Sequence, residues 1–196
     1  MSTSDDEREK KAALYEELRA LEPNFVGEIF HGKLRVSPRP RPRHALATSA
    51  LGGQIMPSFH LGKGGPGGWW ILDEPELHLG YDVLVPDLAG WRRERMPGLP
   101  EEAYFSLAPD WICEVLSSST AGEERVRKLP IYGREGVEHA WLVDPDARSL
   151  EVFRQAGGEW TMIAGFMGTE SVRAAPFEEL ELSLGDLWEP DAPKDE

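Results

Sequence analysis

Two acidic residues lie in apolar stretches of the sequence where hydrophobic side chains would be more stable. In the stretch DWICEVLSSST, the alternation of a β-strand places Glu114 on one face with Ile112 and Leu116. In the run YDVLVPDLAGW, the same alternation places Asp87 on a face with large hydrophobic residues. Two carboxylates that lie close together repel each other unless a proton or a cation separates them, and an oxygen-only site suits Mg²⁺ or Mn²⁺. If the two strands are neighbours, the sequence predicts a divalent metal site.

Each acid also has an ordinary structural explanation. Asp87 follows Pro86, and this dipeptide could simply end a strand in a turn. Glu114 could be a charge on an edge strand or the partner of a buried arginine, although its apolar neighbours disfavour an exposed edge. Both explanations stay open at the level of the sequence.

A lysine in the next predicted helix could complete such a site. Glu124 and Lys128 are four residues apart with the acid first, which is the order of an ordinary surface ion pair. Lys128 also borders the apolar side of the helix, defined by Val126, Leu129 and Tyr132, so its ammonium group could reach the end of the strand instead. There it could stabilise the charge of a phosphate or orient a water molecule.

The rest of the chain predicts the elements that must position these residues. In the N-terminal half we expect an amphipathic helix over about 7–21 behind N-cap candidates Ser4 and Asp5, and then two strands within 26–37 joined through His31 and Gly32. An extended connector PRPRPRH follows, and then a helix-like run over 43–60 that is weakened by Gly52, Gly53 and Pro57. The second half predicts strands at 69–74, 81–91 and 111–116, a helix over about 121–134 and a meander of three strands. This order predicts a single mixed α/β domain over residues 1–190, with a disordered tail at 191–196.

Composition limits the classes of function. The 196 residues are 40% hydrophobic, which favours a globular protein, and the net charge of −14 argues against a general nucleic-acid coat protein. The single cysteine, Cys113, lies in an apolar strand, so a disulfide framework is excluded. The sequence shows neither the apolar core of a signal peptide nor a stretch of about 20 apolar residues for a membrane span. We therefore expect a cytoplasmic protein that does not associate with a membrane.

The motifs around the two acids resemble a known family. The residues VPD, then EVLSSST, Lys128, Tyr132 and WLVDP are similar in order and spacing to the Uma-two family of restriction endonucleases, a branch of the PD-(D/E)XK nuclease superfamily. The resemblance runs from about Asn24 to Pro190. It implies a restriction-endonuclease-like fold, in which helices flank a mixed central β-sheet that here would end in the C-terminal meander. The implied activity is the metal-dependent hydrolysis of phosphodiester bonds in DNA, with Mg²⁺ or Mn²⁺.

The resemblance also implies catalytic residues. Asp87 and Glu114 match the two motif acids that bind the metal, and Lys128 matches a lysine that has moved from the strand to the following helix. Leu116 stands where the wider superfamily has that lysine. Glu28 matches an early acid and could be a third catalytic residue and metal ligand, lie near the metal, or be an exposed hairpin residue.

Basic residues near the predicted site could contact a nucleic acid. By the resemblance, His44 matches a family histidine at the start of a helix, and the neighbouring Arg41 and Arg43 are candidates for phosphate contacts. Arg39 and the cluster WRRER are further candidates, and all of these arginines could instead be solvated charges that offset an acidic surface.

Two departures from the family keep a second function open. His31 and Glu124 stand where aspartates are usual. Together with the net charge, they allow a catalytically inactive nuclease-fold domain that only binds a partner. For an active enzyme, cutting both strands of a duplex would favour a homodimer.

Overall fold

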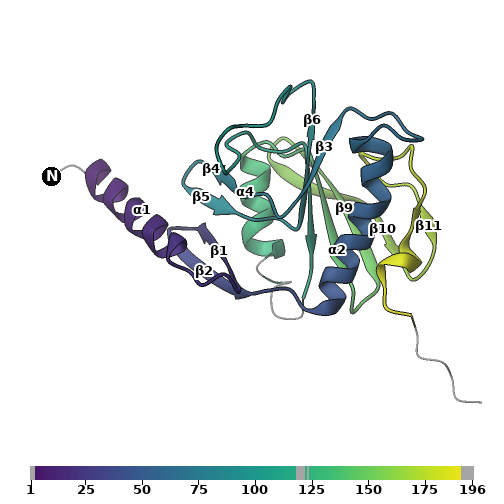
Figure 1. Ribbon diagram of the computed structural model, residues 1–196, viewed down its shortest axis with the longest axis horizontal. Coiled ribbons are helices and arrows are strands. Elements are labelled where there is room, and N and C mark those ends of the chain that lie inside the picture. The colour runs from purple at the N-terminus through teal and green to yellow at the C-terminus, as the bar shows by residue number, and fades with distance from the viewer. Residues whose placement is uncertain (1–2, 118–121, 123, 191–196) are drawn as a thin grey trace, which may run out of the picture.

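The computed structural model (Figure 1) describes residues 3–117, 122 and 124–190. The predicted capping residues 118–120 and the predicted tail 191–196 therefore lie outside the described residues. The elements, in chain order, are α1 (Thr3–Arg19), β1 (Phe25–Phe30), β2 (Lys33–Pro38), α2 (Pro42–Ile55), the π-helix η1 (Met56–His60), β3 (Trp69–Asp73), β4 (Leu77–Leu79), β5 (Asp82–Leu84), β6 (Leu88–Arg92), β7 (Trp111–Val115), the π-helix η2 (Glu124–Lys128), α4 (Leu129–Arg134), β8 (His139–Asp144), β9 (Ser149–Ala156), β10 (Glu159–Met167), β11 (Ser171–Val172), β12 (Leu182–Ser183) and the 3₁₀ helix η3 (Leu184–Leu187).

The strands of the described residues form two main sheets and one small one. The larger sheet has six strands in the order β10-β9-β8-β7-β6-β3, and the second has four in the order β2-β1-β5-β4. In the larger sheet β7 and β8 are parallel, whereas the other neighbours are antiparallel. The larger sheet is therefore mixed, as predicted from the sequence.

The central strand β7 is covered on both faces. Trp111, Cys113 and Val115 belong to a cluster that contains buried residues of α2, η1 and η3. Ile112 and Leu116 belong to a second cluster that contains buried residues of α4 and the four-stranded sheet. Figure 1 shows α2 and α4 on opposite sides of the central strands. The alternation predicted for this strand is therefore confirmed, because its two sets of apolar residues face two different layers.

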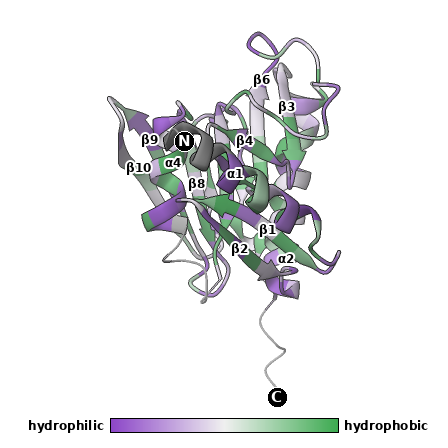
Figure 2. Cartoon of the chain, turned by 90° about the vertical axis from the view of Figure 1, so that its left-hand side faces the viewer, coloured by the Kyte–Doolittle hydropathy of each residue, from purple (hydrophilic) through white to green (hydrophobic). Residues whose placement is uncertain are grey.

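The N-terminal helix α1 packs against β1 and β2 of the four-stranded sheet (Figure 2). A side chain at Gly27 in β1 would overlap Leu18, because a Cβ atom at this position would lie 2.3 Å from the Leu18 Cδ1 atom. Glycine at this position thus allows the side chains of α1 to pack directly on the backbone of β1. The helix already begins at Thr3, so Ser4 and Asp5 lie inside it and the predicted N-cap is wrong.

The predicted strand at 81–91 is wrong, because the run divides into β5 and β6, which belong to different sheets. Pro86 lies between them and cannot donate a ladder hydrogen bond, which favours a break at this point. Asp87 therefore does not share one continuous strand face with Tyr81 and Val83, and its position is set by the start of β6.

The two glycines in α2 do not interrupt the helix. The helix continues through Gly52 and Gly53 to Ile55 and then widens into the π-helix η1, which contains Pro57. Gly52 faces Leu88, whose Cδ2 atom would lie 3.6 Å from an added Cβ atom. Packing against the sheet thus offsets the weak helix propensity of the glycines.

None of the described helices has the length and apolar content that a membrane-spanning segment needs.

Two glycines with opposite surroundings test this packing. A Cβ atom on Gly90 in β6 would lie 3.0 Å from Ile71 Cδ1 and 3.2 Å from Trp111 Cε3, so Gly90→Ala should lower the free energy of unfolding. We expect a loss of about 1–3 kcal/mol from overpacking. Gly53 is exposed within α2 and would meet nothing within 4 Å, so Gly53→Ala should raise stability by about 0.5–1 kcal/mol. Urea unfolding of both variants measures the two effects, and a stable Gly90→Ala variant would contradict the packing described here.

Candidate active site

Asp87 and Glu114 come together through the pairing of β6 with β7. The register places Leu88 opposite Cys113 in an antiparallel pair, so Asp87, one residue before β6, lies level with Glu114. Asp87 Oδ2 accepts a hydrogen bond from the backbone N–H of Val115 at 2.6 Å. The predicted convergence of the two acids is therefore seen, although the strand run that suggested it is divided.

The carboxylate of Glu114 is buried and holds two donors. Its side chain is 3% exposed, and its Oε1 atom lies 2.8 Å from Lys128 Nζ and 2.7 Å from the hydroxyl of Tyr132. β7 runs between β6 and β8, so the alternative of an edge-strand charge is wrong. A buried carboxylate without partners would be strongly destabilising, and these two donors satisfy it.

Lys128 joins Glu114 to a third acid. Its ammonium group lies 2.9 Å from Glu28 Oε1, which also accepts a hydrogen bond from the Val85 backbone N–H at 2.9 Å. Lys128 is only 3% exposed, and the predicted ion pair with Glu124 lies outside the described residues, because the structure does not describe the side chain of Glu124. The side chain of Glu28 is 14% exposed, so the alternative of an exposed hairpin acid is wrong.

The local sequence explains how Lys128 reaches this place. Lys128 is the last residue of η2, and Pro130 follows in the first turn of α4. Because Pro130 cannot donate the helical hydrogen bond to the carbonyl of Val126, a widened turn before it is favoured. Leu129 and Ile131 anchor α4 in the core. The side chain of Lys128 is thereby held inside the protein.

Tyr132 is a site residue that the predicted set did not include. It is fully buried, and burial, with a smaller contribution from the Glu114 carboxylate, raises the pKa of its phenol well above the usual value. The hydroxyl therefore stays protonated and can donate to Glu114 throughout the physiological pH range. Its spacing of four residues from Lys128, on the same side of the helix, was the signal that could have identified it.

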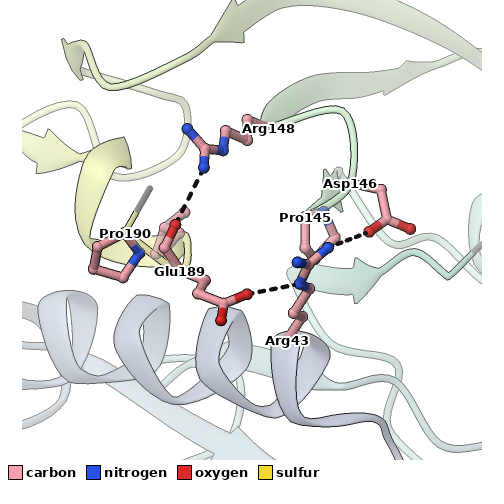
Figure 3. Close-up of a pocket in the computed structure, with 7 residues that line it drawn as sticks. Arg43, Pro145, Asp146, Arg148, Glu189 and Pro190 are labelled. Carbon is pink, nitrogen blue, oxygen red and sulfur yellow. Dashed lines mark hydrogen bonds and ion pairs between the residues drawn. The ribbon is translucent and has the colours of Figure 1, made fainter. Parts of the chain in front are cut away.

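Of the basic residues at the start of α2, two lie at the site and one does not. His44 Nε2 lies 3.2 Å from Asp87 Oδ1, and both side chains are 15% exposed. Arg41 precedes the helix and lines the site cavity, whereas Arg43 points away from it to Glu189 and Asp146 (Figure 3). The structure thus brings His44 and Arg41, but not Arg43, to the cavity itself.

The WRRER cluster is engaged elsewhere. Arg92 and Arg95 lie 3.5 Å and 2.9 Å from Oδ1 of the buried Asp110, and Arg93 lies over the ring of Trp70. These arginines do not line the cavity that contains Glu114. Their contacts are structural.

The functional side chains surround one cavity. It has a volume of about 380 Å³ and opens between the two main sheets, with Glu28, Asp87, Glu114, Lys128, His44 and Arg41 in its wall. Among the described residues, no three acidic, histidine or cysteine side chains are already placed to hold a metal ion together. The ammonium of Lys128 instead lies between the carboxylates of Glu28 and Glu114.

Cys113 takes no part in this chemistry. Burial raises the pKa of its thiol well above the usual value, and the nearby Asp87 and Glu114 carboxylates add to the effect. The thiolate that nucleophilic catalysis needs is therefore disfavoured.

Comparisons with known proteins identify the family and support the fold. Residues 15–185 match the family described as "Uma2: Putative restriction endonuclease". The structure is similar to a solved structure from Anabaena variabilis ATCC 29413, described as "a putative nuclease belonging to DUF820", with a TM-score of 0.67 and 24% identity over 89% of this chain and 96% of that one. No curated protein matches the chain significantly. The fold class predicted from the sequence is confirmed.

Removal of the Lys128 ammonium group should destabilise the protein, because the buried Glu114 carboxylate would lose its cationic partner. Lys128→Met leaves Glu114 without its cationic partner, so we expect the free energy of unfolding to fall by about 3–5 kcal/mol. Adding Glu114→Gln to this variant should restore part of the loss, because the amide carries no charge. Urea unfolding of the single and double variants measures the coupling between the two residues.

An exposed lysine provides the control. Lys63→Met, in the loop before β3, should change stability by no more than about 0.5 kcal/mol. If Lys128→Met were as mild as this control, the pairing of Lys128 with a buried carboxylate would be wrong.

Proposed function

Because the chain belongs to the Uma2 family of restriction endonucleases, we propose that it is a nuclease that hydrolyses phosphodiester bonds in DNA with a divalent cation, Mg²⁺ or Mn²⁺. The observation that carries this proposal is the convergence of Asp87, Glu114 and Lys128 in the wall of one cavity. Two carboxylates and a buried cation are the groups that metal-dependent phosphoryl chemistry needs.

The oxygen donors of the cavity fit a hard divalent cation. Mg²⁺ is commonly held by one or two carboxylates, with water and substrate phosphate oxygens completing its shell. Asp87 and Glu114 are the two carboxylates that would hold the ion here. When bound, such a cation polarises the phosphate and lowers the pKa of an attacking water molecule.

Glu28 takes a different role in this proposal. Its Oε1 atom contacts both the Lys128 ammonium and the Val85 backbone N–H, so these donors already fix its position. We assign Glu28 to the positioning of Lys128, close to the ion rather than as its direct ligand. Lys128 in turn neutralises the charge that develops on the phosphate in the transition state.

The other residues of the cavity orient the reacting groups. The Val115 backbone N–H and His44 hold the two carboxylate oxygens of Asp87. Tyr132 fixes the carboxylate of Glu114. Arg41 lies at the rim, where it can contact a phosphate, and Arg43 lies further along the surface. A positioned set of this kind acts mainly by orientation and electrostatic stabilisation.

Two broader features of the proposal come from the sequence. The single buried cysteine favours a reducing compartment such as the cytoplasm. A homodimer would allow the two strands of a duplex to be cut together.

Incubation with nucleic acid tests the proposal. Purified protein is incubated with plasmid and with single-stranded DNA, with and without Mn²⁺. We expect cleavage by the parent only with the metal, and none by Glu114→Gln or Asp87→Asn. Calorimetry of Mn²⁺ binding should show a loss of affinity of at least about tenfold in both variants, since even outer partners of metal ligands contribute 10- to 100-fold.

The control is an acid far from the cavity. Glu178→Gln, an exposed residue, should leave both cleavage and Mn²⁺ affinity unchanged. Circular dichroism checks that each variant is folded. If folded Glu114→Gln and Asp87→Asn bound Mn²⁺ and cut DNA like the parent, the proposed site would be wrong. Binding of DNA by the parent without any cleavage would instead identify a nuclease-fold binding domain.

A further inference from the structure

The cavity that contains Glu114 continues in two directions along the surface. Toward the start of α2 it adjoins a cavity of about 410 Å³, with which it shares Arg41, His44 and Ser117. That cavity leads to another of about 410 Å³ at Arg43 and Arg148 (Figure 3). Toward α1 the site adjoins a cavity of about 720 Å³, which shares Arg39 and Glu74 with it. A bound strand could in principle follow either direction.

Among the described residues, more arginines than acids line the direction toward α2. Its two cavities are lined by three arginines, Arg41, Arg43 and Arg148, and by two acids, Asp146 and Glu189. Arg43 contacts both acids, and Arg148 donates to the backbone carbonyl of Glu189 at 3.2 Å. Arg41 is exposed and makes no ion pair with any residue that the structure describes. It stands where the site cavity meets the next one, so its charge is available to a phosphate.

The direction toward α1 carries a surplus of negative charge. Its cavity is lined by four acids against two arginines, namely Glu22, Glu74, Glu76 and Glu102 against Arg19 and Arg39. The boundary with the active site is formed by an ion pair in which Arg39 Nη1 lies 2.6 Å from Glu74 Oε2, so this arginine is already neutralised. Within the described residues Glu22 and Glu102 form no ion pair. A phosphate beside these acids would be repelled.

Aromatic rings line the same acidic cavity. Tyr104 stacks on His78 with ring centroids 3.8 Å apart, and Phe25 is 40% exposed. Such rings accept an uncharged nucleobase by stacking. The cavity toward α1 therefore favours a base but disfavours a continuing phosphate chain.

We propose that the substrate is a nucleic-acid strand that has an end close to the bond to be cut. The strand runs past Arg148 and Arg41 to the active site from the side of α2, and the base of its terminal nucleotide occupies the acidic, aromatic cavity beside α1. The enzyme thus acts near strand ends rather than at internal positions of a continuous strand. This inference rests on the proposed nuclease function and specifies its substrate.

A pair of substrates that differ only in their ends tests it. Linear and covalently closed circular single-stranded DNA of the same sequence are incubated with the protein and Mn²⁺. We expect the linear strand to lose single nucleotides from one end, which 5′ and 3′ labels identify. The circle should be cut at least about tenfold more slowly, because one of its phosphates would have to lie beside the acids of the cavity. Repulsion between two solvent-exposed charges is on the order of 1 kcal/mol, which corresponds to a rate factor of about ten. A circle cut as fast as the linear strand would overturn the inference but leave the nuclease function standing. If neither substrate is cut, both proposals are overturned.

Changes of charge test the direction of the strand. Binding of a labelled linear oligonucleotide is measured by fluorescence anisotropy at several salt concentrations without metal. Arg41→Ala should weaken binding and reduce the salt slope by about one. Arg19→Ala, a matched removal of an exposed arginine from the acidic side, should not weaken it. Equal weakening by both variants would overturn the proposed path.

A gain of activity provides the converse test. In the variant Glu22→Gln with Glu102→Gln, the two acids of the cavity beside α1 that pair with no described residue are neutral, so the circular strand should be cut faster than by the parent. Cleavage of the linear strand serves as the internal control for folding and activity. A double variant that cuts the linear strand normally and leaves the circle as resistant as before would overturn the assigned role of these acids.

Discussion

The ammonium group of Lys128 links the two main sheets of the protein at their junction. It lies within 3 Å of carboxylate oxygens from Glu28 in the four-stranded sheet and from Glu114 in the six-stranded sheet. A buried charge is stable only when it is paired, so each of the three residues requires the others. The relative positions of β1, β7 and η2 are thereby coupled to the same contact that organises the cavity.

This coupling explains why the site tolerates several charges inside an apolar layer. Tyr132 is a buried residue of α4 and keeps its proton because it is buried, so it donates to Glu114 without adding charge. Backbone N–H groups of Val85 and Val115 satisfy Glu28 and Asp87. The surrounding apolar residues hold the rotamers of the charged ones, which is the condition for a preorganised site.

The acidic composition of the chain is compatible with a nucleic-acid substrate because charge is distributed unevenly. The net charge is −14, yet, of the residues that the structure describes, more arginines than acids line the two cavities that lead from the active site toward α2. Acidic residues gather in the adjoining cavity beside α1. Local fields, rather than the total charge, direct a phosphate chain. This uneven distribution of charge would limit where a nucleic-acid strand can lie. It therefore supports both the proposed nuclease function and the proposed action near strand ends.

The sequence by itself determined the local elements, and the tertiary structure decided how they meet. Alternation in β7 and the turn at His31 and Gly32 were predicted correctly, because side-chain periodicity and a positive φ are local properties. The resemblance to a family also picked out Glu28, Asp87, Glu114 and Lys128. The division of 81–91 between two sheets and the contact of Lys128 with Glu28 were not predicted, because they depend on strand order and on burial shared by distant segments. Only the packed structure brings the arginines of one adjoining cavity and the acids of the other together from separate parts of the chain.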